Sequence, residues 1–328
     1  MKPVDEIEHY LYRLRIERGY SAHTLAAYRR ELDVLLQALR GQPEGRQDWP
    51  ALTEADVRRW VAAAAREGSS PASLARRLSV WRGFFDELAQ NGRVALNPAR
   101  AVRAPKRPKR LPKALQVDQA VQLLGGQPAE AFTAETSDEA GWLLCRDRAM
   151  AELFYSSGLR LSELTALDHC WIDDAECAHQ SVAWLDRPSA EVQVLGKGGK
   201  RRTVPVGRAA LQALDAWLVL REAFLQLEPR ADRAALFISR RGQRLGNRSV
   251  QLRLERLALR QGVPTHVHPH VLRHSFASHL LQSSGDLRAV QELLGHASIG
   301  STQIYTALDF QHLAAVYDAA HPRARLKK

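Results

Sequence analysis

The chain has 328 residues and a mass of 36.7 kDa, a length that corresponds to about two domains of ordinary size. Charged residues make up 25% and apolar residues 45%, which is typical of globular proteins and excludes a wholly disordered chain. No run of about 18 apolar residues and no signal-peptide segment occurs, so we expect no membrane insertion. Three cysteines without a CxxC pair favour a reducing, cytoplasmic location: Cys145, Cys170 and Cys177.

The chain is strongly basic. Lysine and arginine total 47 and aspartate and glutamate total 36, so the formal net charge is +11. Residues 97–113 contain seven basic side chains, no acidic one and four prolines, and residues 240–260 contain seven arginines and one acidic residue. Such concentrated positive charge favours a nucleic acid as the partner.

Residues 1–96 are predicted to form a domain of four helices, because apolar residues recur there at steps of three and four. Capping residues mark the boundaries of the last three helices: Ser21 and Gly41, Thr53 with Asp56, and Ser70 followed by Pro71. The fourth helix carries an apolar stripe that we interpret as the core of a helix bundle: Leu74, Leu78, Trp81, Phe85 and Leu88.

The basic segment 97–113 is predicted to be a linker, because proline favours extended backbone. Its like charges would repel one another in solvent, whereas beside phosphate groups they would be neutralised. Arg103, Lys106 and Arg107 are therefore candidates for contact with DNA, and a solvated tether is the alternative.

Residues 114–328 show a mixed pattern. A helix is expected to end at Gly158, and a new helix follows with Ser162 near its start. Residues 192–207 alternate apolar and polar side chains around a glycine-rich turn, which indicates a β-hairpin. Further helices are expected from about Val206, Asn247, His270, Asp286 and Ser301. The predicted fold class is mainly α with a small antiparallel β-sheet.

Reactive side chains concentrate in four segments: GLRLSEL (158–164), LGKGGKRR (195–202), HPHVLRHSFASHLL (268–281) and LLGHASIGSTQIY (293–305). Chemistry at a phosphodiester fits this set, because two arginine forks can neutralise the charge of its transition state. A tyrosine can attack phosphorus and hold it covalently. Deprotonating a phenol of pKa about 10 costs roughly 4 kcal/mol at neutral pH, which guanidinium groups and a histidine base could offset.

Each of these residues also has a purely structural explanation. Arg160 could cap a helix, the lysines of the turn could be solvated, and Tyr305 could belong to a core. A zinc site is the alternative for the histidines at 266, 268, 270, 274 and 279. Pro269 interrupts this run and no cysteine or acidic ligand lies nearby in the sequence, so we predict no metal.

The same segments resemble the tyrosine recombinase (phage integrase) family. The likeness rests on GLRLSEL, GKGGKRRTVPV, HPHVLRHSFASHLL, LLGHASIGSTQIY and the tail LDFQHLAAVYDAAHPRARLKK, in this order. It is closest to the bacterial Xer recombinases, and the tail is similar to that of their XerC branch. The N-terminal SAHTLAAYRREL resembles the core-binding domain of the family, so the likeness covers nearly the whole chain.

The resemblance implies a role for each matching residue. Arg160 and Arg273 would grip the scissile phosphate, and Tyr305 would form a 3′-phosphotyrosyl bond. His270 would be an acid–base partner, and His296 would stabilise the transition state. No metal, ATP or other cofactor would be required.

A lysine of the hairpin would be the general acid for the 5′ oxygen. The motif favours Lys197. The interval that separates it from Arg160 is longer than expected for the family, so Lys200 remains an alternative.

The resemblance also implies a C-shaped clamp around duplex DNA. Its parts would be a core-binding (SAM-like) domain over residues 1–96, the linker 97–113 and a catalytic domain over residues 114–328. Further candidates for DNA contact are Arg76, Arg77 and Arg82 on the fourth helix, where a solvated face is the alternative, and Arg241, Arg244 and Arg248 in the arginine-rich segment.

The implied partners are DNA and a related recombinase. Two copies of this chain would act with two copies of a XerD-type partner on a dif-like site and resolve chromosome or plasmid dimers before cell division. A DNA translocase at the division septum would be a further partner, and the enzyme would be cytoplasmic and nucleoid-associated. Residues 310–320 would dock into a neighbouring recombinase or, alternatively, pack within their own chain. A mobile-element integrase or invertase, a type IB topoisomerase and a non-catalytic DNA-binding protein are the rival functions.

Overall fold

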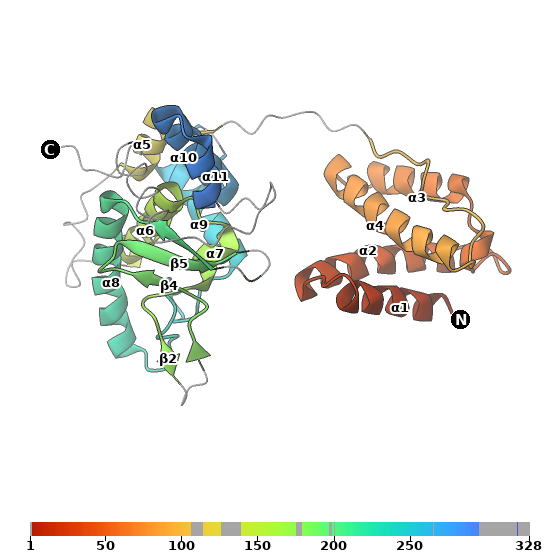
Figure 1. The fold of residues 1–328 in the computed structure, drawn as a ribbon, viewed down its shortest axis with the longest axis horizontal. Coiled ribbons are helices and arrows are strands. Elements are labelled where there is room, and N and C mark those ends of the chain that lie inside the picture. Colours follow the sequence, from red (N-terminus) through yellow and green to blue (C-terminus); the bar gives the residue numbers. More distant parts are fainter. Residues whose placement is uncertain are drawn as a thin grey trace. The chain divides into compact units, whose positions relative to one another are not determined.

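The computed structural model describes residues 2–105, 114–125, 139–174, 179–196, 199, 201–264, 266–294 and 320. The chain divides into two compact units, Met1–Leu111 and Pro112–Lys328 (Figure 1). None of the helices in these described ranges is both long enough and apolar enough to cross a membrane.

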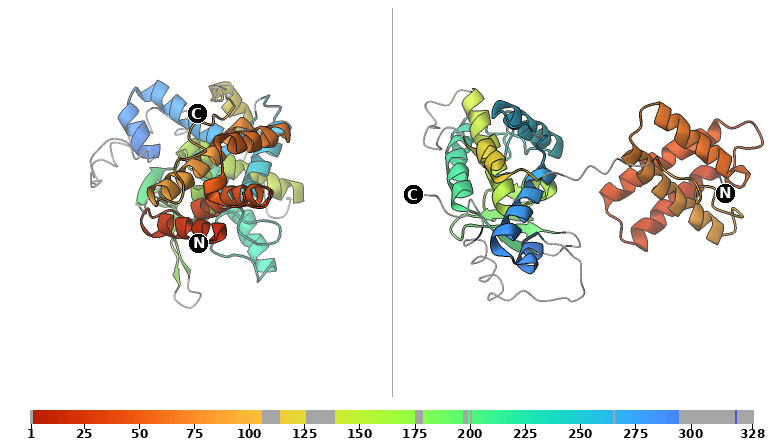
Figure 2. Two further views of the ribbon diagram at one scale, coloured as in Figure 1. Left: turned by 90° about the vertical axis from the view of Figure 1, so that its right-hand side faces the viewer. Right: turned by 90° about the horizontal axis from the view of Figure 1, so that it is seen from above.

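Over residues 2–105, the first unit contains helices and no strand (Figure 2). Its elements are α1 (Pro3–Ile16), α2 (Ala22–Arg40), the 3-10 turn η1 (Trp49–Ala51), α3 (Glu54–Arg66) and α4 (Pro71–Gln90). The predicted helix starts are confirmed, since the side chains of Ser21, Thr53 and Ser70 each accept a backbone N–H from the first turn of their helix. Helix α4 packs against α1, α2 and α3 and lies at the centre of the bundle.

The apolar stripe of α4 forms the core of this unit, as predicted, and its five members are buried: Leu74, Leu78, Trp81, Phe85 and Leu88. The core continues past residue 96, because Ala99 and Val102 are buried in it. The guanidinium group of Arg82 donates hydrogen bonds to the carbonyl oxygens of both residues. The beginning of the expected linker therefore packs on the first unit.

The second unit combines helices with short strands. Its elements are α5 (Val117–Leu124), α6 (Glu139–Ser157), α7 (Leu161–Ala166), β1 (Leu167–Asp168), β2 (Asp173–Asp174), β3 (His179–Gln180), β4 (Ala183–Asp186), β5 (Glu191–Leu195), β6 (Arg201–Pro205), α8 (Arg208–Leu227), α9 (Asn247–Arg260), α10 (Pro269–Ser284) and α11 (Leu287–Leu294). The helices expected near residues 206, 247, 270 and 286 are confirmed, and the one expected from Ser301 lies outside the described residues.

The main sheet has the strand order β1-β4-β5-β6. Strands β5 and β6 form the predicted hairpin, and β4 pairs antiparallel with β5. Strand β1 differs from the expectation, because it pairs parallel with β4. The chain between β1 and β4 forms the separate β2–β3 pair. This long connection allows β4 to run in the same direction as β1.

Helix α6 is the centre of the second unit. It packs against α5, α8, α9, α10 and β6, so it is buried on nearly every side. Its C-terminal end is fastened to the end of β6: Ser157 Oγ donates to the carbonyl oxygen of Pro205 at 2.9 Å, and Ser156 Oγ accepts from the Gly207 N–H at 2.7 Å. The chain therefore leaves α6 beside the sheet, and the site residues follow there.

Candidate phosphate-binding site

The turn after α6 sets the position of Arg160. Gly158 adopts φ +56°, and a Cβ at this position would overlap the ring of Phe276 on α10. Only glycine therefore fits this turn without strain. Two residues later, Arg160 is the N-cap residue of α7, and its backbone N–H donates to Glu163 Oε2 at 2.7 Å. The helix start predicted from the sequence is confirmed.

A buried carboxylate, Glu163, joins two arginines. It accepts a hydrogen bond from Arg160 Nη1 at 2.7 Å and two from Arg202 of β6, at 2.7 and 2.8 Å. Its side chain is 3% exposed. Burial by itself would raise the pKa of the Glu163 carboxyl group, but hydrogen bonds and positive charge from Arg202 and Arg160 hold this pKa below its ordinary value. Glu163 is therefore ionised at neutral pH.

Arg273 on α10 is the third arginine of the site. It donates to the carbonyl oxygen of Gly158 and, at 2.6 Å, to that of Leu294 at the end of α11. Burial, together with the positive charges of Arg160 and Arg202, lowers the pKa of Arg273 to about 10, although Glu163 opposes this shift. Arg273 therefore remains charged at neutral pH.

These four side chains form what we call the arginine cluster: Arg160, Glu163, Arg202 and Arg273. Glu163 pairs with Arg160 and Arg202, and Arg273 is bonded to the carbonyl oxygens of Gly158 and Leu294, so these four side chains together carry a net charge of +2. Held partly out of water, such an excess attracts an anion, and arginine forks match the oxygens of a phosphate. From the sequence, Arg160 and Arg273 were predicted to act on the same phosphate, but no role was predicted for Glu163 or Arg202. The three-residue spacing between Arg160 and Glu163 was the available signal.

Histidines lie at the start of α10. His268 is the N-cap residue and His270 lies in the first turn, with their ring centroids 6.1 Å apart. His270 is exposed, and it is on the same helix as Arg273. His279 is instead buried, with its Nδ1 2.8 Å from the Tyr155 hydroxyl group. Within the described residues, no group of three or more histidine, cysteine or acidic side chains has the arrangement of a metal site.

Several predicted site residues lie outside the described residues: Lys106, Arg107, Lys197, Lys200, His296 and Tyr305. The strands that flank the two lysines end at Leu195 and begin at Arg201, and α11 ends two residues before His296.

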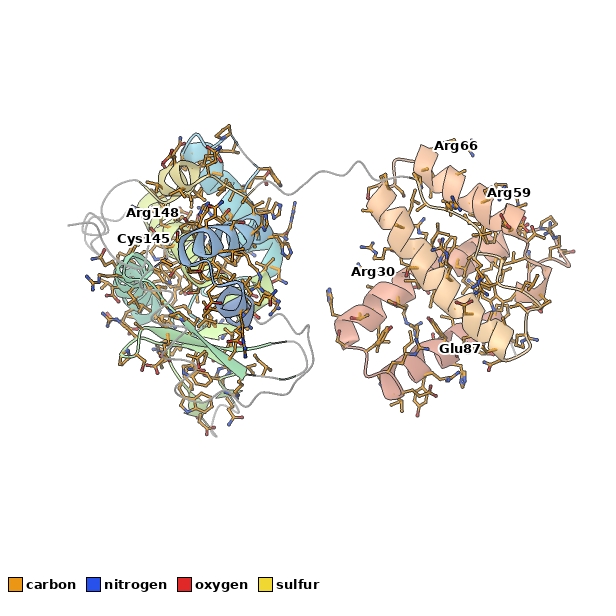
Figure 3. The ribbon with its side chains drawn as sticks, turned by 45° about the horizontal axis from the view of Figure 1, so that its top comes forward. Arg30, Arg59, Arg66, Glu87, Cys145 and Arg148 are labelled. Carbon is orange, nitrogen blue, oxygen red and sulfur yellow. The ribbon has the colours of Figure 1, made fainter. Side chains whose placement is uncertain are left out.

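The candidates for DNA contact fall into two groups. Arg76 and Arg77 both pair with Glu31 of α2, at 3.0 and 2.9 Å, and Arg244 pairs with Asp168 at 2.6 Å and Asp232 at 3.3 Å. These contacts favour structural roles for the three arginines. Within the described part of the chain, the exposed side chains of Arg103, Arg241 and Arg248 make no ion pair. Two exposed arginines of the first unit that the sequence did not single out are Arg30 and Arg66 (Figure 3).

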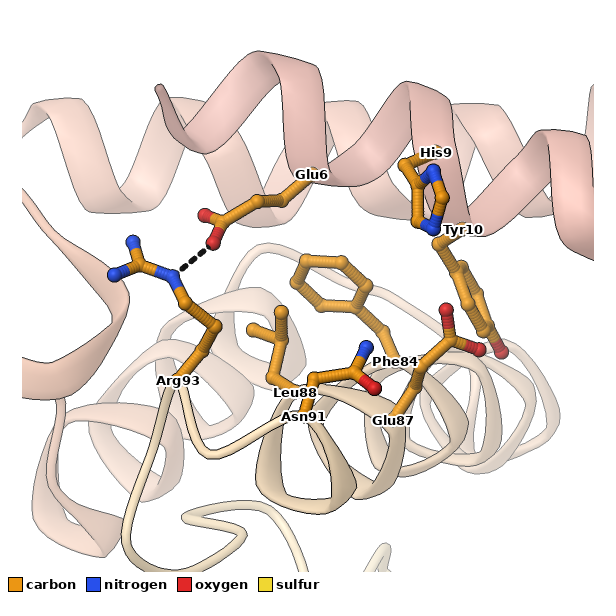
Figure 4. Close-up of a pocket in the computed structure, with 8 residues that line it drawn as sticks. All are labelled: Glu6, His9, Tyr10, Phe84, Glu87, Leu88, Asn91 and Arg93. Carbon is orange, nitrogen blue, oxygen red and sulfur yellow. Dashed lines mark hydrogen bonds and ion pairs between the residues drawn. The ribbon is translucent and has the colours of Figure 1, made fainter. Parts of the chain in front are cut away.

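The first unit also contains a pocket of about 340 Å³ between α1 and α4. Glu6 and Arg93 form an ion pair at one end, and Tyr10 and Glu87 lie at the other (Figure 4). Phe84 and Leu88 lie between these ends, together with Asn91. None of the predicted site residues lines this pocket.

Two family profiles and several curated relatives match this chain. The profile of the Phage integrase family matches residues 127–312, and that of the phage integrase N-terminal SAM-like domain matches residues 7–92. The tyrosine recombinase XerC of Ralstonia pickettii (strain 12J) is 54% identical over 327 residues, covering 99% of this chain and 96% of the relative. The tyrosine recombinase XerC of Pseudomonas aeruginosa PAO1 is 49% identical over 322 residues, covering 98% and 96%.

Solved structures share the fold. A lambda integrase dimer bound to a COC′ core site has a TM-score of 0.60 at 21% identity, covering 93% of this chain and 100% of that one. The XerH site-specific recombinase bound to its difH substrate has a TM-score of 0.59 at 19% identity, covering 96% and 81%. With the family profile matching more than half of the residues and close relatives matching almost all of them, the chain belongs to the phage integrase family of tyrosine recombinases, enzymes that cut and rejoin DNA strands.

Proposed function

We propose that this enzyme recombines DNA at a specific site through a phosphotyrosyl intermediate, with the scissile phosphate bound by Arg160 and Arg273. The observation that carries the proposal is the arginine cluster itself. Residues more than a hundred positions apart in the sequence converge there, and Glu163 neutralises only one of three positive charges. His270 lies on the helix that supplies Arg273, which supports its role as the acid–base partner.

The proposed reaction exchanges one phosphorus–oxygen bond for another. The phenol oxygen of Tyr305 attacks the phosphorus while His270 takes the phenol proton. The bond to the 5′ oxygen breaks, and Lys197 donates a proton to that oxygen. The 3′ phosphate is then joined to Tyr305, with His296 stabilising the transition state. Because the phosphodiester energy is kept in the new bond, a 5′ hydroxyl group can reverse the step without ATP, metal or other cofactor.

We further propose a biological setting of the XerC type. Two copies of this chain would act with two copies of a XerD-type recombinase at a dif-like site and resolve chromosome or plasmid dimers during division. A septal DNA translocase would be an additional partner, and the enzyme would work at the nucleoid in the cytoplasm. The support is the identity of 54% and 49% to relatives named XerC over almost the whole chain.

The two units would clamp the DNA duplex between them. Residues 1–96 would form the core-binding domain, residues 97–113 the linker and residues 114–328 the catalytic domain. The docking of residues 310–320 into a neighbouring recombinase remains part of the proposal. Ala320, the one described residue of this segment, packs against the apolar cluster that α10 and α11 of its own chain form. In the isolated chain this contact favours the intramolecular alternative.

A nicked suicide substrate tests the chemistry. The fragment that carries the 5′ hydroxyl group diffuses away after cleavage, so the covalent adduct accumulates and can be counted on a denaturing gel. We expect wild-type protein to form the adduct in the presence of a chelator, and Tyr305→Phe to bind the same DNA without forming it. An adduct that persists in Tyr305→Phe, or that the chelator abolishes, would refute the proposed mechanism.

A further inference from the structure

Two consecutive arginines of β6 point to opposite faces of the sheet. Arg201 is exposed, and its guanidinium group lies over the rings of Trp184 and Trp171, at 5.3 and 5.8 Å from their centroids. Arg202 has a side chain only 12% exposed and pairs with Glu163. The alternation of side chains along a strand accounts for this separation. The strand therefore offers one arginine to the site and a matched arginine outside it.

Arg202 connects three elements of the site. Both of its terminal nitrogens donate to the Glu163 carboxylate on α7, and its Nε donates to the carbonyl oxygen of Leu293 on α11 at 3.3 Å. Its own strand follows directly on the turn that contains both candidate lysines. Arg202 is thus hydrogen-bonded to α7, which begins directly after Arg160, and to α11, which precedes His296 in the chain.

Arg160 can bind a phosphate only if Glu163 does not hold its guanidinium group too strongly. A second cation, Arg202, therefore has to share the negative charge of Glu163. If Arg202 were absent, Arg160 would be the one remaining ion-pair partner of Glu163 among the described residues. A buried carboxylate that has a single cationic partner binds this partner strongly, because little water is present to solvate the negative charge. The Arg160 guanidinium group would then be drawn onto Glu163 and away from the substrate.

We propose that Arg202 is a positioning residue for DNA cleavage: it satisfies Glu163, so that Arg160 stays available to the scissile phosphate, and it fixes β6 and the end of α11 against the arginine cluster. This inference rests on the proposed function, because it takes Arg160 to be a phosphate ligand. Arg202 itself does not touch the reacting atoms.

The first test compares Arg202→Gln with Arg201→Gln in single-turnover cleavage of the suicide substrate, with the enzyme in excess. We expect Arg202→Gln to bind DNA almost normally and to form the adduct about 10- to 100-fold more slowly, a typical loss when a supporting residue is removed. The matched control Arg201→Gln should cleave at close to the wild-type rate. Equal cleavage rates in the two variants would overturn the proposal.

A second variant separates positioning from plain destabilisation. In Arg202→Gln combined with Glu163→Gln, residue 163 keeps an oxygen that can accept from Arg160 but no longer carries a charge. We expect this double variant to cleave faster than Arg202→Gln alone, because Arg160 is released from the ion pair. A merely structural role predicts that the double variant is as slow or slower, and this result would overturn the proposal.

The conservative Arg202→Lys covers the case in which Arg202→Gln does not fold. Lysine keeps the charge and loses the fork, so intermediate cleavage at an unchanged unfolding midpoint would support the proposal. Wild-type cleavage in Arg202→Lys would show that the fork is not needed and would overturn the positioning of α11. Failure of the proposed function has a different signature: Tyr305→Phe would then still form the adduct, whatever the Arg202 variants do.

Discussion

The guanidinium group of Arg273 donates a hydrogen bond to the carbonyl oxygen of Gly158, 115 residues earlier in the chain. This bond fastens the middle of α10 to the turn that precedes Arg160. The two arginines proposed to bind the phosphate are therefore connected through the backbone of one glycine. Phe276, one turn further along α10, fills the space above this glycine.

We expect Gly158→Ala to destabilise the protein and to slow cleavage. An alanine there has to adopt a left-handed conformation, which costs about 1–2 kcal/mol, and its Cβ also meets the Phe276 ring. Gly285→Ala is the matched control, because Gly285 has φ +67° and no atom within 4 Å of an added Cβ. Urea unfolding should show the larger loss of free energy in Gly158→Ala. Equal losses would mean that the contact with Phe276 is unimportant.

The buried His279 predicts a loss of stability at acid pH. Burial lowers its pKa, although a backbone hydrogen bond with Leu115 opposes the shift. In the unfolded chain a histidine has a pKa of about 6.5, so below that pH the unfolded state binds a proton that the folded state does not. The free energy of unfolding contributed by this group is therefore unaffected above pH 6.5 and declines as the pH falls below it.

His279→Gln isolates this contribution from the other histidines. We expect the difference in unfolding free energy between pH 7.5 and pH 5.5 to be smaller in this variant than in wild type, whatever its absolute stability. The same difference in both proteins would contradict a neutral, buried His279. The hydrogen bond to Tyr155 can be examined separately with Tyr155→Phe.

A modified substrate distinguishes the two candidate lysines. A substrate with sulfur in place of the bridging 5′ oxygen releases a thiol of pKa about 8.5, which departs without a proton donor. We expect Lys197→Ala to cleave the ordinary substrate about 100-fold or more slowly than wild type and to recover on the sulfur substrate. Lys200→Ala should be nearly normal on both. The reverse pattern would assign the general acid to Lys200.

The arginines of the 240–260 segment should separate into DNA contacts and structural residues. Arg241 and Arg248 are exposed, so replacing either by alanine should weaken DNA binding, reduce the slope of log affinity against log salt by about 1, and leave stability unchanged. Arg244→Ala removes the ion pair to Asp168, a carboxylate whose side chain is only 2% exposed. This variant should lower the unfolding midpoint. Unchanged stability would return Arg244 to the candidate DNA contacts.

Local signals in the sequence predicted most of the elements. Ser21, Thr53 and Ser70 mark helix starts because a cap interacts with residues three positions away. The hairpin of β5 and β6 follows from alternation around a glycine-rich turn. The parallel pairing of β1 with β4 had no such signal, because it depends on where the chain returns after the β2–β3 excursion.

The partners of charged side chains were the least predictable feature. Arg76 and Arg77 pair with Glu31, which is 45 and 46 residues away, and Arg202 pairs with Glu163, which is 39 residues away. A sequence shows that a residue is charged but not which opposite charge the fold brings to it. The two motifs that contain Arg160 and Arg273 were recognisable in the sequence, whereas the ion pairs of Glu163 with Arg160 and Arg202 were seen only in the structure.

Helix α11 ends with two carbonyl oxygens, those of Leu293 and Leu294, that are bound by arginines from β6 and α10. The end of this helix is thus held by side chains that also belong to the arginine cluster. A substitution in β6 or α10 that removes one of these hydrogen bonds should therefore displace the end of α11, from which the chain continues to His296 and Tyr305. Loss-of-function substitutions should consequently be found on those two elements even where they lie far from the nucleophile along the chain.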